Sequence, residues 1–317
     1  MIPIITIQGP TAVGKSSLAF ELAQKINSDI ISADSRQVYK LMNIGTAKPD
    51  KKELNKVKHH LVNIIYPDQK YSAGDFVRDS EKTINKLNKR NKIPIIAGGT
   101  GFYIKALLKG IFQSPKIPNS IKQHFQKVLK DKGKKELYFL LSKVDPQSAK
   151  RIHPNDVQRI LRALEVWKYT GKNLTSHWKA QKTKKKYKSL NILLYRERNS
   201  LYEKINNRVD KMIENGLIEE FKSLVEKGYS QEDPGMNTVG YKELFPLLES
   251  EKELINCIEK IKKHTRNYAK RQLTWYRKTK FDLTFEINEL TILEMTSQII
   301  EHFNKKIGDY NDGCQSK

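Results

Sequence analysis

The feature that most constrains the fold of this chain is an octapeptide, GPTAVGKS, at residues 9–16. It matches the pattern G-x-x-x-x-G-K-[ST], in which the backbone amides of a glycine-rich loop bind phosphate groups. The motif follows a short β-branched run at residues 3–8, which predicts a strand, and it precedes a helical pattern at residues 16–26. A chance glycine turn is the alternative, but a strand before the loop and a helix after it are the context that the motif requires.

The octapeptide also supplies candidate ligands for a diphosphate group. The loop amides and the helix amino terminus would bind phosphate oxygens, Lys15 would add a positive charge, and the Ser16 hydroxyl would coordinate magnesium, Mg²⁺. The predicted diphosphate-binding residues are Gly9, Pro10, Thr11, Ala12, Val13, Gly14, Lys15 and Ser16, with Ser16 as the metal ligand. The loop identifies a diphosphate and does not by itself identify ATP.

Strand and helix patterns alternate through the amino-terminal part of the chain. Residues 30–31 predict a second short strand, and residues 93–97 predict another, which a glycine-rich turn closes. Between them, Ser72 is a predicted N-cap for a helix that runs towards Arg90. This alternation predicts an α/β fold, a P-loop NTPase-like parallel sheet flanked by helices.

The pattern changes near Gly110. From there to about residue 188 the periodicity is helical with few strand candidates, and residues 190–194 (LNILL) again predict a strand. We therefore expect a basic, all-helical insertion at residues 111–188. It interrupts a catalytic core made of residues 1–110 and 189–317.

Positive charge is concentrated in two blocks. The chain has 59 Lys and Arg against 35 Asp and Glu, a net charge of +24, and residues 109–198 hold 23 of the basic residues with six acidic ones. A second block at residues 260–280 contains nine basic residues and no acid, interleaved with Tyr268, Trp275 and Tyr276. A solvated surface is the alternative for the lysine-rich run at 182–188. Together the blocks favour a nucleic-acid partner over a membrane, since neither adjoins an apolar anchor.

One helical stripe in the second block predicts a helix side that faces the core, because its members recur at spacings of three and four. The stripe consists of Ile258, Ile261, Thr265, Tyr268, Gln272 and Trp275. Two cysteines are too few for a disulfide framework, which favours a cytoplasmic location. The amino terminus predicts neither a signal peptide nor a membrane span.

Two polar residues at predicted strand ends are candidates for chemistry. Asp34 follows the second strand, where a carboxylate opposite the phosphate loop would hold Mg²⁺, orient a nucleophile or accept its proton. The alternative for Asp34 is a turn cap, which is common for Asp followed by Ser. Thr100 is similarly open, as a residue of a glycine-rich turn or as a hydroxyl that faces the site.

Six segments in this order resemble the bacterial tRNA dimethylallyltransferases, also called tRNA isopentenyltransferases, and the resemblance covers residues 4–278. The segments are GPTAVGKS (9–16), SADSRQVYKLMNIGTAKP (32–49), GGTGFYIKALLKG (98–110), HPNDVQRILRALEV (153–166), TVGYKE (238–243) and TRNYAKRQLTWYRK (265–278). The phosphate loop alone occurs in many unrelated enzymes, whereas the six together are specific.

The resemblance implies that a dimethylallyl group moves from dimethylallyl diphosphate to N6 of the adenosine on the 3′ side of the anticodon, in tRNAs that read codons beginning with U. By analogy with the family, Asp34 would be the base, Thr100 would line the same channel, and Arg208 would lie near the diphosphate. The implied tRNA-binding residues are Asp34, Ser35, Arg36, Gln37, Thr100, Lys122, Gln158, Arg159, Ile160, Leu161 and Arg162. The implied cofactor is Mg²⁺, the implied partner is the anticodon stem-loop of tRNA, and the expected state is a monomer.

Two other functions fit part of the sequence. A small-molecule P-loop kinase would also use residues 9–16 and an aspartate such as Asp34, but it gives no reason for the basic insertion. An RNA-binding protein with a vestigial phosphate loop would explain the charge, but it leaves the loop without a role. We expect an enzyme, a prenyltransferase, because that function accounts for all six segments.

Overall fold

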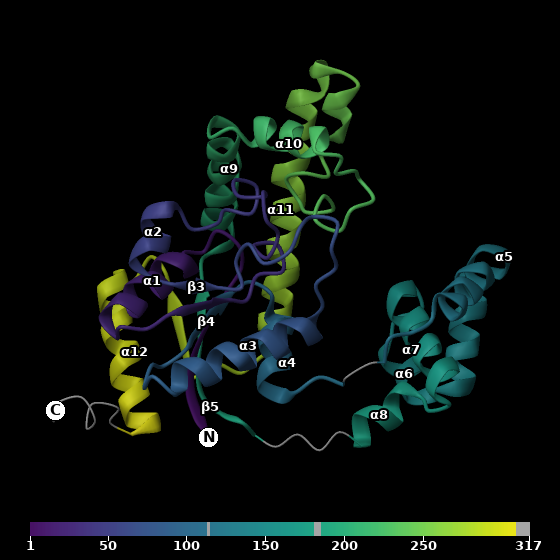
Figure 1. The fold of residues 1–317 in the computed structure, drawn as a ribbon, viewed down its shortest axis with the longest axis horizontal. Helices are drawn as coiled ribbons and strands as arrows, with labels where there is room; N and C mark the ends of the chain where they lie inside the picture. The colour runs from purple at the N-terminus through teal and green to yellow at the C-terminus, as the bar shows by residue number, and fades with distance from the viewer. Residues whose placement is uncertain (113–114, 181–184, 309–317) are drawn as a thin grey trace. The chain divides into compact units, whose positions relative to one another are not determined.

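A computed structural model describes residues 1–112, 115–180 and 185–308 of the chain (Figure 1). It divides into two compact units. The larger consists of Met1–Lys109 and Lys185–Lys317, and the smaller is Gly110–Lys184. The larger unit contains every strand of the described residues. It resumes at Lys185, four residues before the boundary expected at residue 189, and β5 begins at Tyr187.

The larger unit is built on a six-stranded sheet in the order β3-β2-β4-β1-β5-β6, and every pair of neighbours is parallel. The strands are β1 (Ile2–Gln8), β2 (Ile30–Ser32), β3 (His59–His60), β4 (Ile95–Gly98), β5 (Tyr187–Tyr195) and β6 (Leu283–Glu286). β1 is central, with Ile5 opposite Ile95 on one side and Leu190 on the other. The predicted α/β fold with a parallel sheet is confirmed.

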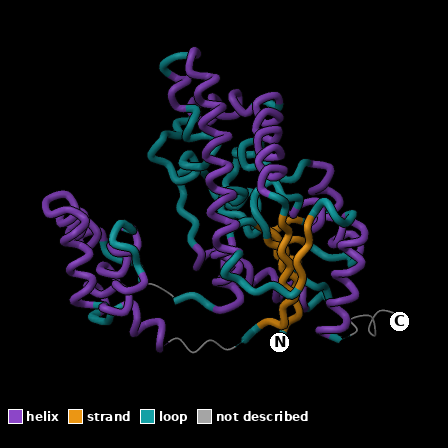
Figure 2. Tube along the Cα trace, turned by 180° about the vertical axis from the view of Figure 1, so that it is seen from behind, coloured by secondary structure: helices purple, strands orange, loops and turns teal. Residues whose placement is uncertain are grey.

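Helices surround this sheet, as the purple tube around the orange strands shows (Figure 2). They are α1 (Lys15–Lys25), α2 (Lys51–Lys56), α3 (Ala73–Asn88), α4 (Gly101–Lys109), α9 (Arg198–Glu214), α10 (Leu217–Glu226), α11 (Leu254–Tyr276) and α12 (Ile292–Ile307), with 3₁₀ turns at Phe245–Leu248 and Glu251–Glu253. α1 packs against α12, and α9 packs against α10 and α11. Strand residues such as Ile7 and Ile192 form one core with α1 and α12, while α9, α10 and α11 enclose a second around Phe221 and Tyr241.

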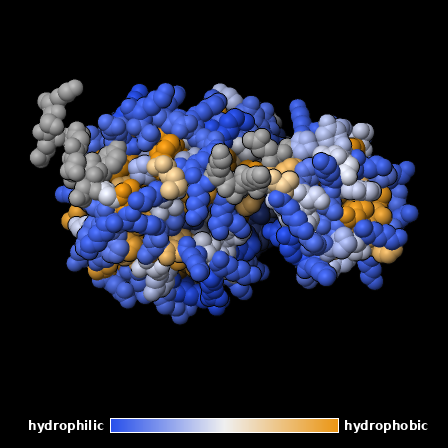
Figure 3. Space-filling view, turned by 90° about the horizontal axis from the view of Figure 1, so that it is seen from below, coloured by the Kyte–Doolittle hydropathy of each residue, from blue (hydrophilic) through white to orange (hydrophobic). Residues whose placement is uncertain are grey.

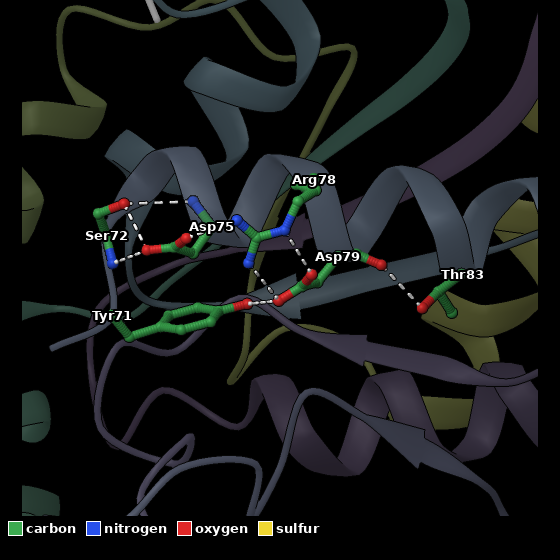
Figure 4. Close-up of polar contacts among 6 residues, drawn as sticks. All are labelled: Tyr71, Ser72, Asp75, Arg78, Asp79 and Thr83. Atoms are coloured by element: carbon green, nitrogen blue, oxygen red, sulfur yellow. Dashed lines mark hydrogen bonds and ion pairs between the residues drawn. The ribbon is translucent and has the colours of Figure 1, made fainter. Parts of the chain in front are cut away.

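The start of α3 is fixed by side chains (Figure 4). Ser72 is the N-cap, as predicted, and it forms a capping box with Asp75, whose amide donates to the Ser72 hydroxyl at 3.2 Å. Arg78 donates to Asp75 and to Asp79, at 2.7 and 3.1 Å. The Tyr71 hydroxyl donates to Asp79 at 3.1 Å. These bonds orient the amino-terminal end of α3.

The end of α3 that they orient supports α4. The Tyr103 hydroxyl donates to the Tyr71 carbonyl at 3.2 Å, and the Tyr103 ring stacks on Phe76 with centroids 4.6 Å apart. α4 begins directly after Thr100. The α3 contacts therefore also fix the turn that carries this candidate residue.

The smaller unit is helical throughout its described residues. It contains α5 (Asn119–Val144, kinked at Gly133), α6 (Pro146–Arg151), α7 (Val157–Thr170) and α8 (Leu174–Ala180) around its own apolar core. Buried Asp145 accepts hydrogen bonds from Ser148 and Thr175, and these bonds lower the pKa of its carboxyl group although burial opposes them. This carboxylate joins the start of α6 to α8.

The face shown in Figure 3 is mainly hydrophilic: blue residues predominate, and small orange apolar patches lie among the blue residues. No helix within the described ranges is both long and apolar enough to cross a bilayer.

Candidate active site

A cavity of about 570 Å³ opens at the carboxyl ends of β1, β2 and β4, the edge where parallel α/β sheets bind ligands. Turns after these strands form one side of it, and α9 and α11 form the other. Its lining residues are Thr11, Ala12, Gly14, Lys15, Ser16, Ser17, Ser32, Asp34, Gln37, Thr46, Ala47, Ala97, Gly98, Gly99, Lys204, Asn207, Arg208, Lys211, Tyr268 and Gln272. The cavity therefore brings Lys15 and Asp34, from the first two strand ends of the sequence, together with the distant Arg208.

A second cavity of about 280 Å³ adjoins the first. Five residues line both, namely Thr11, Asp34, Thr46, Arg208 and Tyr268. Residues 237–240 and α11 form much of the rest of the second wall, so the TVGYKE segment also contributes to the site. Asp34 lies where the two cavities meet, and a group bound in either one can approach its carboxylate.

The phosphate loop has the geometry that its sequence predicts. Gly14 adopts φ +107°, which favours glycine, and it is the N-cap of α1. The loop residues that line the cavity are Thr11, Ala12, Gly14, Lys15 and Ser16. Val13 instead packs into the core of the sheet, with 1 % of its surface exposed. Gly9 and Pro10 are buried behind the loop.

Lys15 is held inside its own loop. Its ammonium group donates to the Pro10 carbonyl at 2.6 Å. Burial lowers the pKa of Lys15 to about 7, with the Arg208 guanidinium acting in the same direction and the Asp34 carboxylate opposing both. An anion bound beside Lys15 would favour the charged ammonium, because opposite charges stabilise each other in a partly desolvated site.

Asp34 combines the two roles that its sequence left open. Its Oδ1 accepts hydrogen bonds from the amides of Arg36 and Gln37, at 2.8 and 3.4 Å, so the residue does cap a turn. Both hydrogen bonds that this carboxylate accepts within the described part of the chain go to Oδ1. Oδ2 therefore remains free to accept a proton or to bind a cation.

The residues after Asp34 are held by the protein itself. The Ser35 amide donates to the Thr100 hydroxyl at 3.1 Å, and Arg36 donates to the Pro234 carbonyl at 3.2 Å. The Gln37 side chain accepts from Ser32 and donates to the carbonyl of Ala47 at 3.1 Å. Arg36 lines the second cavity and Gln37 the first. Thr100, in the turn after β4, therefore holds Ser35, in the turn after β2, in place.

Glu220, which the sequence did not single out, holds the loop at residues 43–46. Glu220 of α10 accepts hydrogen bonds from the amides of Asn43, Ile44 and Gly45, at 2.8 to 3.4 Å. The Tyr241 hydroxyl donates to Glu220 at 2.5 Å and accepts from the Gly45 amide at 3.1 Å. The loop so held carries Thr46, which lines both cavities.

α9 presents a row of positive charge to the first cavity. Lys204, Arg208 and Lys211 all line it from successive turns of the helix. Arg208 donates no hydrogen bond to any residue that the structure describes. Burial lowers the pKa of its guanidinium, and the Asp34 carboxylate opposes that shift. A buried guanidinium that donates no hydrogen bond to the described residues favours a bound anion.

The predicted core-facing stripe of α11 is partly wrong. Within the stripe, Ile261 and Gln272 are buried, whereas Thr265 and Tyr268 are only partly buried and line the cavities. The other buried residues of the helix, Cys257, Ala269 and Tyr276, lie outside the stripe. Apolar periodicity marks the side of a helix that faces the protein, but it does not distinguish a filled core from a cavity wall. Burial and the Asp34 charge raise the pKa of Tyr268 to about 12, so this residue remains a neutral hydroxyl at physiological pH.

The residues present fit a magnesium ion bound together with a diphosphate. Ser16 and Asp34 line the same cavity. Among the described residues, no group of three or more His, Cys, Asp or Glu side chains is arranged to hold a metal. Mg²⁺ commonly binds through one or two protein ligands, substrate phosphates and water, so a hydroxyl and a single carboxylate suffice.

The remaining candidate residues belong to the smaller unit. Lys122 is exposed on α5, and Gln158 and Arg159 are exposed on the first turn of α7. Ile160 and Leu161, in contrast, have 0 % and 8 % of their surface exposed and pack into the core of this unit. Any RNA contact made by side chains of this segment therefore falls to its polar members.

Arg162 and Lys122 lie close together in this unit, around one carboxylate. Arg162 lies 3.8 Å from Glu165, and both cations lower the pKa of Glu165, although burial raises it overall. Of the lysine run at 182–188, residues 182–184 lie outside the described residues.

Comparisons with known proteins agree with one another. The family model described as IPP transferase matches residues 37–279. A protein of Halothermothrix orenii named tRNA dimethylallyltransferase is 44% identical over 311 residues, which cover 97% of this chain and 89% of that protein. One of the same name from Thermosipho melanesiensis is 45% identical over 299 residues, 94% of this chain and 98% of that protein.

Solved structures give the same result. A tRNA delta(2)-isopentenylpyrophosphate transferase of Staphylococcus epidermidis is 39% identical, covers 96% of this chain and 99% of its own, and has a TM-score of 0.71. A eukaryotic dimethylallyltransferase acting on tRNA is 31% identical, with 95% of this chain and 79% of its own covered and a TM-score of 0.81.

Proposed function

This chain belongs to the IPP transferase family and is a prenyl-transferring enzyme of the tRNA dimethylallyltransferase kind, and from its site we propose the following reaction. The enzyme transfers the dimethylallyl group of dimethylallyl diphosphate to N6 of the adenosine 3′-adjacent to the anticodon, in tRNAs that read codons beginning with U. The observation that carries the proposal is the convergence of Lys15, Arg208 and Asp34 on one cavity.

The phosphate loop and α9 bind the donor. The amides of residues 12–16 and the cations of Lys15 and Arg208 surround the diphosphate. As the bond between the allylic carbon and oxygen breaks, negative charge accumulates on the leaving diphosphate. Fixed cations in a partly buried site stabilise that charge more in the transition state than in the ground state, and this difference lowers the barrier. Arg208 is suited to this role because no protein acceptor within the described residues competes for it.

Magnesium is the proposed cofactor, and Ser16 would hold it together with the phosphate oxygens of the donor and water. When bound, the ion would add positive charge beside the phosphate oxygens and so favour departure of the diphosphate.

Asp34 is the proposed base. The adenosine N6 lone pair forms the new bond to the allylic carbon, the carbon–oxygen bond to diphosphate breaks, and one N6 proton passes to Asp34 Oδ2. Proton removal matters here because the lone pair of an exocyclic amine is delocalised into the ring. Since Oδ1 is occupied by the amides of Arg36 and Gln37, the free oxygen is held in a fixed orientation.

The acceptor is a base in the anticodon stem-loop, which must leave its stack to enter the cavity. Unstacking costs about a few kcal/mol, less in a loop than in a duplex. Residues 34–37 and Thr100 are proposed to recognise the flipped base and its neighbours. Lys122, Gln158, Arg159 and Arg162 of the smaller unit, together with the basic residues of 182–188 and 260–280, are proposed to bind RNA phosphates, which position a nucleic acid without specifying its sequence. The proposed state is a cytoplasmic monomer.

The kinase and the RNA-binding alternatives are not favoured. Relatives that match nearly the whole chain carry the name of a prenyl-transferring enzyme, which neither alternative explains. A kinase would also need ATP, whereas prenyl transfer consumes none.

One incubation tests the proposal. The protein is mixed with dimethylallyl diphosphate, Mg²⁺ and unmodified tRNA, without ATP, and the digested RNA is analysed by mass spectrometry. We expect one nucleoside to become heavier by one dimethylallyl group, and a tRNA with guanosine at that position to remain unmodified. An unmodified product from a tRNA that binds the protein would overturn the assignment of the donor, and ATP-dependent labelling of a small molecule would favour the kinase.

A further inference from the structure

Gln272 joins two loops of the site through one side-chain amide. This residue of α11 is buried, with 6 % of its surface exposed. Its Oε1 accepts a hydrogen bond from the Thr11 amide in the phosphate loop at 2.9 Å, and its Nε2 donates to the Gly99 carbonyl at 2.8 Å. Thr11 and Gly99 follow β1 and β4, neighbouring strands, so the amide spans the ends of both.

The turn at Gly99 has no free space towards α11. A Cβ atom added to Gly99 would lie 2.4 Å from Nε2 of Gln272, so the Gln272 side chain would have to move away from the turn. The Tyr276 hydroxyl, one turn further along α11, donates to the same Gly99 carbonyl at 3.1 Å. The turn is therefore held against the helix by two hydrogen bonds and by close packing.

From Gly99 the connection reaches the proposed base. The next residue is Thr100, whose amide donates to the Ala33 carbonyl and whose hydroxyl accepts from the Ser35 amide, both at 3.1 Å. Ala33 and Ser35 flank Asp34. One line of hydrogen bonds thus runs from the phosphate loop through Gln272 to the two turns that carry Thr100 and Asp34.

We propose that Gln272 is a positioning residue that sets the separation between the diphosphate-binding loop and the turns that carry Thr100 and Asp34. The role rests on the proposed function, in which donor and acceptor are bound by these two parts of the site. Only a side chain with one acceptor and one donor at this spacing satisfies both loops. Small changes in such a separation alter the rate strongly, because the reacting atoms must lie in near-attack geometry.

Two substitutions separate this role from packing. Gln272→Met keeps the length and volume of the side chain but removes both hydrogen bonds. Gln272→Glu keeps the acceptor for Thr11 but turns a carboxylate oxygen towards the Gly99 carbonyl, where two acceptors repel. Thr274→Val is the matched control, since Thr274 lies exposed on the same helix and, among the residues that the structure describes, its hydroxyl donates to the Lys270 carbonyl alone. Thermal unfolding of each variant shows that it is folded.

Three measurements then follow. With saturating substrates, we expect the single-turnover rate of Gln272→Met to fall by about 10²-fold, while the Kd for tRNA stays within about twofold. The affinity for inorganic diphosphate, used as a probe of the loop alone, should fall by about tenfold in the same variant. Hydrogen exchange of peptides covering residues 9–16 and 98–101 should accelerate in Gln272→Met. In Gln272→Glu it should accelerate mainly at 98–101.

The outcomes are distinguishable from those of the proposed function. Wild-type rates and unchanged exchange in both Gln272 variants would overturn the positioning role. A loss of rate that tracked melting temperature, with diphosphate affinity unchanged, would also overturn it, because packing alone would then explain the loss. If the wild-type protein transferred no dimethylallyl group, the proposed function would fail, but diphosphate affinity and exchange would still decide the link between the loops.

Discussion

The carboxylate of Asp34 shows how one residue serves structure and chemistry with different atoms. Oδ1 holds the turn and Oδ2 is the proposed proton acceptor. Asp34→Asn separates these roles, because an amide oxygen can still accept from Arg36 but the side chain no longer takes up a proton. We expect the single-turnover rate to fall by ~10²–10⁴-fold with tRNA affinity retained.

Asp68→Asn is the control for Asp34→Asn, since Asp68 is exposed and lines neither cavity. Rates are followed by rapid quench and tRNA affinity by filter binding. A near-normal rate in Asp34→Asn would remove this carboxylate from proton transfer and restrict it to its turn.

The lowered pKa of Lys15 predicts that the protein takes up protons when it binds diphosphate. The Lys15 pKa of about 7 means that most of the unliganded enzyme carries a neutral amine at pH 8. A bound diphosphate raises this pKa, so binding at pH 8 draws a proton onto Lys15, and affinity from this source is lost as pH rises above about 7. Calorimetry in buffers of different ionisation enthalpy measures the uptake. We expect more proton uptake by wild type than by Lys15→Met at pH 8, and equal uptake would contradict the role.

Among the helices and strands, those with a signal in the local sequence were predicted correctly. The run at residues 3–8, the glycine loop and the helix after it became β1, the phosphate loop and α1, and Ser72 caps α3 as expected. β3 and β6 were missed because His59–His60 and Leu283–Glu286 are short edge strands without an apolar run. Their pairing depends on neighbours distant in sequence.

The cavity walls were harder to predict than the strands. Gln272 was assigned to a core-facing stripe because helical spacing does not distinguish a core from a cavity wall. Glu220 gave no local signal at all, since its partners in the loop at residues 43–45 are more than 170 residues away along the chain. Asp34 and Lys15 could be singled out because their strand, turn and loop contexts are local.

The clamp that Glu220 places on this loop makes a prediction at the scale of an element. Glu220→Gln keeps the size of the side chain but loses its charge and one acceptor oxygen, so at least one loop amide loses its partner. We expect the free energy of unfolding to fall by about 1–3 kcal/mol and hydrogen exchange at residues 42–47 to accelerate.

Glu219→Gln is the matched control for the Glu220 clamp, because Glu219 is exposed on the same turn of α10. Denaturant unfolding gives the stability, and mass spectrometry gives the exchange. Equal stability and equal exchange in the two variants would show that the loop does not depend on Glu220.

At the scale of the whole molecule, the two units divide the work that the proposed reaction requires. All described residues that line the first cavity belong to the larger unit. The smaller unit contributes no residue to that lining, but it carries exposed cations. Chemistry and RNA affinity should therefore respond to different substitutions. Loss of positive charge from the smaller unit should weaken tRNA binding and leave the rate on saturating tRNA unchanged.

Salt dependence tests this division, because each phosphate contact that a protein cation makes releases counterions. Lys122→Ala and Arg159→Ala should each reduce the slope of log K against log salt by about 0.7–0.9 and lower affinity about equally for all tRNA sequences. Lys305→Ala is the control, since Lys305 pairs with Glu301 on α12 of the larger unit. Slopes are measured by filter binding between 50 and 200 mM salt, a range over which the Debye length falls by about half. Slopes equal to that of Lys305→Ala would show that the charge of the smaller unit is only solvated, and RNA affinity would then have to come from the cations of α9 and α11.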